Sequence, residues 1–354
     1  RENMSDNQLV EFAQCADPDS GPYFFTNNFF SIQHPTKGRM LYKAFPYQED
    51  LITYYHENRF SINLLGRQMG KTTTAAGYLL WYAMFVPDST ILIAAHKYSG
   101  AQEIMQRIRY AYELCPNHIR AGVTSYNKGS IEFDNGSRIV SQTTTETTGR
   151  GMSITLLYCD EFAFVRPSIA KEFWTSISPT LATGGKAIIT STPNSDEDQF
   201  WLLWKGANKR IDEFGNETKL GVNGFAGYIA TWEKHPDRDE TWAAEEMSRV
   251  GEERFKREHL CEPVIFDETL INSIKLMEMT SKEPLQKQGQ VRWWKTPQKG
   301  KIYVVALDPS LGTGGDNSAL QVYELPEMIQ VAEWMHNKTP IQQQVRILAE
   351  ITKY

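Results

Sequence analysis

The sequence contains few cysteines, and none of them stands in a metal-binding pattern. Its 354 residues include four cysteines, without the CxxC or Cys/His spacings that hold zinc. We therefore expect no zinc site and predict reduced thiols, as in a cytosolic protein. The four are Cys15, Cys115, Cys159 and Cys261.

Long apolar runs and an excess of positive charge are also missing. No apolar run approaches the roughly 20 residues that a helix needs to cross a bilayer, and no signal peptide is recognisable. We therefore expect no membrane association. The formal net charge is -6, whereas a passive DNA-coating protein is usually basic. This argues against a histone-like role but not against an enzyme that grips DNA transiently through a local patch.

What is present is an ordinary globular composition, with 41% hydrophobic and 23% charged residues. At roughly 150 residues per domain, the length predicts about two domains. Because the sequence opens at Arg1 rather than at a methionine, we expect further residues upstream.

From Phe60 onward, short apolar runs alternate with helix-like stretches. Turn residues bound each run, which is typical of buried strands, and the alternation predicts an α/β domain with a mainly parallel sheet. Asn135-Gly136 predicts a hairpin turn. Residues 1–40 are expected to form short helices and loops, and residues 239–259 one long polar helix. The predicted strands are 62–65, 91–95, 130–133, 138–141, 154–159 and 187–190, and the predicted helices 73–85 and 100–114.

A phosphate-binding loop is predicted at residues 66–73, GRQMGKTT, between a strand and a helix. Backbone N–H groups around Gly70 would cradle the β-phosphate, Lys71 would neutralise β/γ oxygens, and the Thr72 hydroxyl would complete Mg²⁺ coordination. The usual pattern places its first glycine at the position of Leu65; here it comes one residue late, at Gly66. The alternative is a chance GKT at the start of a helix.

Two further strand ends carry polar groups that suit such a loop. The apolar run before Asp160 and Glu161 ends in adjacent carboxylates, of which Asp160 suits Mg²⁺ and Glu161 suits the general base that polarises the attacking water. Adjacent acids could also mark a strand end that meets solvent. The hydroxyls of Thr190 and Thr192 could sense the γ-phosphate; the alternative is a polar strand-to-loop transition.

In combination, these motifs resemble the large terminase subunit of tailed bacteriophages, a DNA-packaging ATPase and nuclease. The resemblance spans roughly residues 40–320 and implies a P-loop NTPase of the ASCE/RecA-like type, with a parallel sheet and flanking helices. Its specific features are the shifted glycine and internal arginine of the loop. It also rests on residues 93–97 (IAAHK), 127–130 (NKGS), 150–151 (RG), 160–164 (DEFAF) and 190–194 (TSTPN), which follow in the family's order.

The resemblance implies further site roles. Gln48 would pair with the adenine edge and Tyr47 would stack on the ring, although Tyr47 could instead be a half-buried helix aromatic. Arg67 in cis, or Arg150 acting on a neighbouring subunit's ATP, would serve as an arginine finger; the alternative for Arg150 is a surface salt bridge. The nucleotide-binding set is Tyr47, Gln48, Gly66, Gln68, Gly70, Lys71, Thr72, Thr73, Thr190 and Thr192.

We expect a motor domain over residues 1–266, a linker over 267–300, and an incomplete ribonuclease-H-like nuclease domain over 301–354. In the resembling family that domain cuts DNA with two metal ions, Mg²⁺ or Mn²⁺. Asp308 matches the first ligand and Asp316 is an auxiliary candidate; a strand-end aspartate without a metal role is the alternative. Because the chain stops at Tyr354, before further ligands, we expect it not to cut DNA.

The linker also holds the basic stretch that is visible in the sequence and could contact DNA; the alternative is a solvated linker whose tryptophans pack between domains. The stretch comprises Lys282, Lys287, Arg292, Trp293, Trp294, Lys295, Lys299 and Lys301.

The predicted function is therefore Mg²⁺-dependent ATP hydrolysis that drives double-stranded DNA into a procapsid. Partners implied by the resemblance are the portal protein, the small terminase subunit and further copies in a ring. The expected location is the host cytoplasm at the portal vertex of the procapsid, and not the mature virion. Alternatives are a helicase-like DNA translocase, an ATP-regulated nuclease, and a non-catalytic scaffold that binds ATP as a switch.

Overall fold

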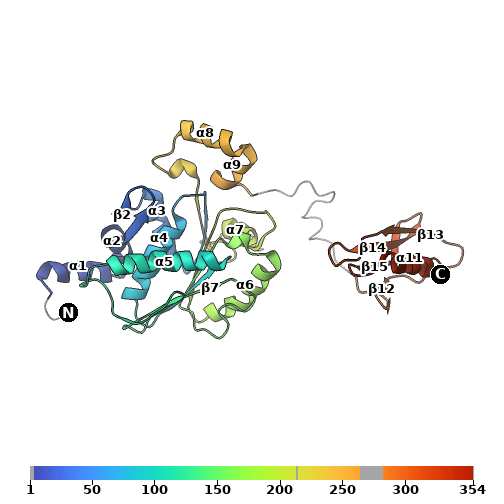
Figure 1. Cartoon of the computed structure of the whole chain (residues 1–354), viewed down its shortest axis with the longest axis horizontal. Helices are drawn as coiled ribbons and strands as arrows, with labels where there is room; N and C mark the ends of the chain where they lie inside the picture. Colours follow the sequence, from blue (N-terminus) through green and yellow to red (C-terminus); the bar gives the residue numbers. More distant parts are fainter. Residues whose placement is uncertain (1–3, 213, 264–281, 354) are drawn as a thin grey trace. The chain divides into compact units, whose positions relative to one another are not determined.

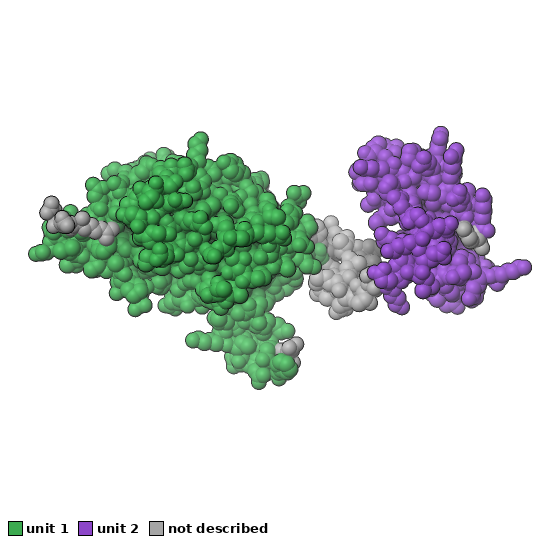
Figure 2. All heavy atoms as spheres, turned by 90° about the horizontal axis from the view of Figure 1, so that it is seen from below, with its two compact units in different colours: residues 1–268 green, residues 269–354 purple. Residues whose placement is uncertain are grey.

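The computed structural model describes residues 4–212, 214–263 and 282–353. The chain divides into two compact units, residues 1–268 and residues 269–354, which Figure 2 shows in green and purple. Each unit has its own hydrophobic core. No helix among the described residues is long and apolar enough to span a bilayer.

Unit 1 begins with two short helices, α1 (Asp6–Ala16) and α2 (Gly21–Asn28), as expected. A hairpin of β1 (Ser31–His34) and β2 (Gly38–Leu41) follows, where the sequence suggested only loops. Its strands have four residues each and little apolar alternation, which is why the sequence did not reveal them. Helix α3 (Pro46–Glu57) then leads into the central sheet.

The central sheet of unit 1 confirms the predicted α/β fold with a mainly parallel sheet. Its eight strands run in the order β10-β3-β9-β8-β4-β7-β6-β5. All neighbouring strands from β10 to β7 in this order are parallel. The predicted Asn135-Gly136 turn joins β6 to β7 in an antiparallel hairpin, and β5 pairs antiparallel with β6 at the edge of the sheet. The strands are β3 (Phe60–Leu65), β4 (Thr90–Ala95), β5 (Val123–Tyr126), β6 (Ser130–Phe133), β7 (Arg138–Thr143), β8 (Leu156–Asp160), β9 (Lys186–Ser191) and β10 (Ala226–Ala230).

Helices cover both faces of this sheet, which is why its central strands are buried and mostly apolar (Figure 1). Strand β8 shows the division, because Leu156 and Tyr158 join one core while Leu157 and Cys159 join the other. The first core includes residues of α3, α4 (Lys71–Phe85) and α5 (Tyr98–Leu114). The second includes residues of α6 (Pro167–Leu181), α7 (Gln199–Asn208) and the 3-10 turn η1 (Phe162–Phe164).

Unit 1 ends in a helical pair rather than in the single long helix that the sequence suggested. Helix α8 (Glu240–Val250) and α9 (Glu252–His259) meet at Gly251, whose φ is 87°. A positive φ ends a right-handed helix, and glycine adopts it without steric cost. Aromatic and aliphatic side chains of the two helices pack with the 3-10 turn η2 (Trp232–Lys234) in a small core of their own.

Unit 2 is a five-stranded sheet in the order β11-β12-β15-β14-β13, and all of its described pairings are antiparallel. Helix α11 (Ile341–Ile351) adds Ile351 to its core. The strands are β11 (Gln286–Gln288), β12 (Val291–Trp293), β13 (Ile302–Asp308), β14 (Ser318–Leu325) and β15 (Ile329–His336).

The prediction that residues 267–300 form a linker is wrong for its C-terminal part, because residues 286–293 form two strands of this sheet. Strand β11 is polar and exposed at every position, so apolar periodicity could not reveal it. Residues 264–281 lie outside the described part of the chain.

Most residues of the basic stretch that was expected to contact DNA form contacts within unit 2. Arg292 pairs with Glu333 at 3.2 Å, and Lys295 and Lys301 both pair with the buried Glu324, at 2.7 and 3.5 Å. Trp293 is part of the core, and the Trp294 indole donates to the backbone carbonyl of Lys282. These ion pairs remove much of the positive charge that would attract DNA to this stretch.

Candidate active site

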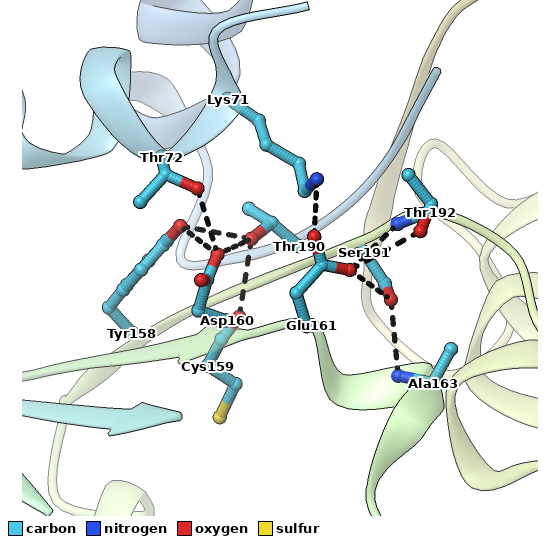
Figure 3. Close-up of polar contacts among 10 residues, drawn as sticks. All are labelled: Lys71, Thr72, Tyr158, Cys159, Asp160, Glu161, Ala163, Thr190, Ser191 and Thr192. Atoms are coloured by element: carbon cyan, nitrogen blue, oxygen red, sulfur yellow. Dashed lines mark hydrogen bonds and ion pairs between the residues drawn. The ribbon is translucent and has the colours of Figure 1, made fainter. Parts of the chain in front are cut away.

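The predicted site residues gather where three parallel strands end. Strand β3 leads into the phosphate loop, β8 ends at Asp160, and β9 ends at Ser191, one residue before Thr192. Because β9 lies between β3 and β8, its hydroxyls reach the carboxylates beside it (Figure 3). Ligands of open parallel sheets bind at this edge.

Gly70 shapes the start of the loop helix. It caps α4 in the left-handed region, with φ 75°, and a Cβ there would lie 2.6 Å from the Gln48 amide nitrogen. Both observations require glycine. The first N–H groups of a helix lack intrahelical partners and carry partial positive charge, which is the usual arrangement for binding phosphate.

Tyr47 and Gln48, which are predicted to hold the adenine, make contacts with the loop backbone that the sequence did not indicate. The Tyr47 hydroxyl and the Gln48 amide both donate to the carbonyl of Met69, at 2.9 and 3.2 Å. The Gln48 carbonyl accepts from the Tyr42 hydroxyl and the Phe45 amide, each at 3.0 Å. Tyr47 and Gln48 are only 2% and 5% exposed. In this conformation both side chains brace the loop by donating to the Met69 carbonyl.

This bracing also orients the loop's N–H groups. The carbonyl and amide of a trans peptide point in opposite directions. With the Met69 carbonyl drawn toward Tyr47, the Gly70 N–H points away from that side of the loop. Gln68, whose φ is 59°, adopts the left-handed conformation that non-glycine residues rarely take. Backbone strain of this kind often occurs at functional sites.

The outer side of the loop is held by residues near α8 and α9. Arg67 donates through its backbone to the carbonyl of Glu258 at 2.6 Å, and its guanidinium pairs with the Glu258 carboxylate at 3.0 Å. Arg238 donates to the carbonyls of Arg67 and Gln68 while stacking 4.4 Å above the Trp242 ring. Sequence reasoning missed Arg238, because no motif marks it. In this structure Arg67 points to α9, not to Lys71 or Glu161.

Lys71 and Glu161 form the closest ion pair of the predicted catalytic residues. The Lys71 ammonium lies 2.5 Å from Glu161 Oε1. The other oxygen, Oε2, accepts from Ser191 Oγ at 3.4 Å and from the amide and hydroxyl of Thr192 at 3.3 Å each (Figure 3). Glu161 itself has φ 51°. The carboxylate is therefore fixed from two sides and faces the phosphate loop.

Asp160 is the other carboxylate of the site, and it is 7% exposed. Its Oδ1 atom accepts from Tyr158 at 2.8 Å, from Thr190 at 3.2 Å and from Thr72 at 3.4 Å. Hydroxyl and carboxylate oxygens are the ligands that Mg²⁺ prefers. Thr72 and Asp160 thus fit a Mg²⁺ ion that accompanies a nucleotide.

Burial, and after it the charge of Glu161, raise the pKa of Asp160 above its ordinary value. The ammonium of Lys71 and the hydroxyls of Tyr158 and Thr190 act in the opposite direction. A cation bound beside the carboxylate would favour its charged form further.

Three other predicted residues, Thr73, Arg150 and Gly66, have partners outside the loop and the two carboxylates. The Thr73 hydroxyl accepts from Arg107 of α5 at 2.9 Å, a contact that no sequence pattern indicated. Arg150 donates to Ser176 of α6 at 2.9 Å. Among the described hydrogen bonds and ion pairs, none joins Arg150 to the phosphate loop. Gly66 donates to the carbonyl of Ala230 at 2.9 Å, which fixes the beginning of the loop.

The predicted metal ligands of unit 2 are Asp308 and Asp316. Asp308 is exposed at the end of β13, and Asp316 lies in the turn before β14. Ser310 links this turn to the sheet by donating to the Asp316 carbonyl at 2.9 Å. Within residues 4–212, 214–263 and 282–353, no group of three or more His, Cys, Asp or Glu side chains is placed to hold a metal ion.

The phosphate loop on this sheet defines the class of unit 1 as a P-loop NTPase fold. The profile of the family described as "Terminase large subunit, T4likevirus-type, N-terminal" matches residues 62–277, more than half of the chain. The chain therefore belongs to the large terminase subunit family, as its motifs predicted.

Solved structures of phage terminases share this fold. An arginine-to-alanine mutant of the large terminase ATPase domain of Thermus phage P74-26 has 21% identity and a TM-score of 0.50, over 63% of this chain and 95% of that one. The large terminase of bacteriophage HK97 has 18% identity and a TM-score of 0.56, over 92% of this chain and 67% of that one. At these identities the likeness concerns the fold.

Proposed function

We propose that the chain hydrolyses ATP with Mg²⁺ and uses the energy to move double-stranded DNA into a procapsid. The observation that carries the proposal is the contact of Lys71 with Glu161 at the phosphate loop, beside a buried Asp160 that is in reach of Thr72. The direct test is the rate of phosphate release from ATP with Mg²⁺ and with EDTA. A rate that EDTA leaves unchanged would contradict it.

Phosphate binding would exchange one anionic partner of Lys71 for another. Its ammonium now pairs with Glu161, and the phosphate oxygens of ATP would compete for it with a stronger negative charge. The N–H groups at the start of α4 would bind the same phosphates. Release from Lys71 would leave Glu161 free to accept a proton.

Thr72 and Asp160 are the residues that would hold Mg²⁺, directly or through its water. Bound there, Mg²⁺ would neutralise charge on the β- and γ-phosphate oxygens. Thr72 sits in the first turn of α4, next to Lys71, so the same helix end binds phosphate and metal.

Glu161 is the proposed general base. The donors from Ser191 and Thr192 hold Oε2, so the Lys71-facing Oε1 is the oxygen left to orient and deprotonate water. General-base catalysis typically contributes about 10²–10⁴-fold. Arg67 or Arg150 is proposed to stabilise the transition state. Arg67 must leave Glu258 to do so, and Arg150 would act on a neighbouring subunit in a ring.

Thr190 and Thr192 connect β9 to both carboxylates, and their replacement by valine is expected to uncouple hydrolysis from movement. Valine keeps the β-branched shape, but it removes the hydroxyls that contact Asp160 and Glu161. Phosphate release and DNA packaging should be measured on the same preparations. Thr175→Val, in an exposed turn of α6, is the matched control. Variants that package DNA with unchanged efficiency per ATP would refute this role.

Double-stranded DNA is the proposed cargo, and we expect only weak binding by this chain alone. A packaging motor must accept any sequence, so it contacts phosphates, and such contacts weaken as salt rises. The net charge of -6 is unfavourable for DNA binding, and the ion pairs of Arg292 and Lys295 reduce the positive charge that the basic stretch offers to DNA. Fluorescence anisotropy with duplexes of different sequence, at two salt concentrations, measures this. Tight, salt-insensitive binding to one duplex would instead indicate a site-specific regulator.

The proposed partners are the portal protein, the small terminase subunit and further copies of the chain. Because the proposed motor acts on a procapsid, its proposed location is the host cytoplasm at the portal vertex. For unit 2 we propose a contribution to nuclease chemistry that needs further carboxylates besides its own, with Asp308 at the end of β13 as the first ligand for Mg²⁺ or Mn²⁺ and Asp316 as an auxiliary ligand. Carboxylates at strand ends are the ligands that two-metal nucleases use.

A further inference from the structure

The hydroxyl of Tyr158 is a buried polar group in strand β8, whose residues before Asp160 are otherwise apolar. Tyr158 is 0% exposed in the middle of β8, between Leu157 and Cys159. Burying a hydroxyl costs free energy unless it is hydrogen-bonded. A phenylalanine would fill the same space without that cost, so the partners of the hydroxyl are informative.

Those partners belong to the proposed active site. Tyr158 lies 2.8 Å from Asp160 Oδ1 and 3.0 Å from Thr190 Oγ1 (Figure 3). The phenol has one proton, and a carboxylate is the strongest acceptor nearby. Tyr158 therefore donates to Asp160. The single proton of the Thr190 hydroxyl has two acceptors in reach, the Tyr158 oxygen at 3.0 Å and Asp160 Oδ1 at 3.2 Å.

Strand geometry explains why residue 158 can do this. Side chains two residues apart on a strand point to the same face, so Tyr158 and Asp160 both face α4. Strand β9 is hydrogen-bonded to β8 with Asp160 opposite Thr190. The hydroxyl of Tyr158 thus lies where the carboxylate and the neighbouring strand meet.

All three described hydrogen bonds of the Asp160 carboxylate end on Oδ1. The shortest is the one from Tyr158, and only Tyr158 donates from a ring that the core holds rigidly. We propose that Tyr158 is a positioning residue for Mg²⁺ binding, because it fixes the Asp160 carboxylate in the orientation that receives the ion or its water. The inference rests on the proposed Mg²⁺-dependent ATPase.

The test is the Mg²⁺ dependence of nucleotide binding in Tyr158→Phe. Affinity for a fluorescent ADP analogue is measured in EDTA and across a Mg²⁺ titration. The variant loses one hydrogen bond to a charged carboxylate. We therefore expect the Mg²⁺ concentration that gives half of the full effect on nucleotide affinity to rise by about tenfold. Affinity in EDTA should match the wild type, because Tyr158 does not contact the phosphate loop in the described contacts.

Tyr55→Phe is the matched control. Tyr55 is also 0% exposed, and its hydroxyl has no hydrogen-bond partner among the described residues. Removing it is the same chemical change at another buried tyrosine, and it should leave the Mg²⁺ titration unchanged. Thr190→Val removes a second hydroxyl that contacts Asp160 Oδ1 as well as Tyr158, so it should shift the titration in the same direction. If Tyr158→Phe alone shifts the titration less than Thr190→Val alone, Thr190 and not Tyr158 is the main positioning residue.

The outcomes separate this inference from the proposed function. A wild-type titration without any Mg²⁺ effect would contradict the ATPase itself and the inference with it. A normal wild-type titration that Tyr158→Phe reproduces would overturn the positioning role alone. Equal shifts in Tyr158→Phe and Tyr55→Phe would also overturn it, since the effect would then come from general packing.

Discussion

The Lys71→Ala variant is expected to lose ATP turnover altogether. Lys71 is 8% exposed at the start of α4, and its ammonium is the cation that touches the proposed base. Alanine removes the charge that would neutralise β- and γ-phosphate oxygens, so both nucleotide binding and the transition state lose stabilisation. Phosphate release at saturating ATP, together with ADP affinity, measures the two effects separately.

Lys171→Ala is the matched control for this variant. Lys171 lies on an exposed turn of α6, so its loss should change neither binding nor turnover. Melting temperatures of both variants show whether they fold, because removing Lys71 also leaves the Glu161 carboxylate without its partner. A folded Lys71→Ala protein with normal turnover would rule out the phosphate-loop assignment.

Glu161→Gln is expected to slow hydrolysis by about 10²–10⁴-fold, the usual contribution of a general base. Glutamine keeps the size of the side chain and can still meet the donors of Ser191 and Thr192. Single-turnover hydrolysis measures the chemical step directly. Glu172→Gln, on the exposed side of α6, is the control that should behave as the wild type.

Although Glu161→Gln should slow hydrolysis, we do not expect it to weaken nucleotide binding. Glu161 now competes with phosphate for the Lys71 ammonium, so the neutral glutamine should leave ADP affinity equal or higher. Loss of affinity with unchanged residual turnover would show that Glu161 holds the loop and is not the base.

The core of the fold was predictable because its strands are buried on both faces. Strands β3, β4, β8 and β9 are almost entirely buried and mostly apolar, with turn residues at their ends, as is typical of parallel sheets that are covered on both faces. The phosphate loop and the two acids were recognisable for a related reason. Their chemistry needs particular residue types at strand ends, and the parallel sheet then brings those ends together.

Other features depend on contacts between distant parts of the chain, which local patterns do not encode. Arg238 reaches the loop from a segment without a motif. Gln48 lies within the expected motif, yet its amide serves the Met69 carbonyl. The exposed, polar β11 joins a sheet only because β12 pairs with it. Tyr158 was predicted only as part of an apolar strand, and its role became evident from the hydrogen bond to Asp160.

The most direct test of the packaging motor is DNA uptake by portal-bearing procapsids. The amount of duplex DNA that becomes resistant to nuclease is measured alongside phosphate release, with wild-type protein and with Glu161→Gln. We predict ATP- and Mg²⁺-dependent protection of DNA of any sequence, lost in the variant together with hydrolysis. Protection of DNA that continues when hydrolysis has stopped, or active hydrolysis that never yields protected DNA, would contradict the account.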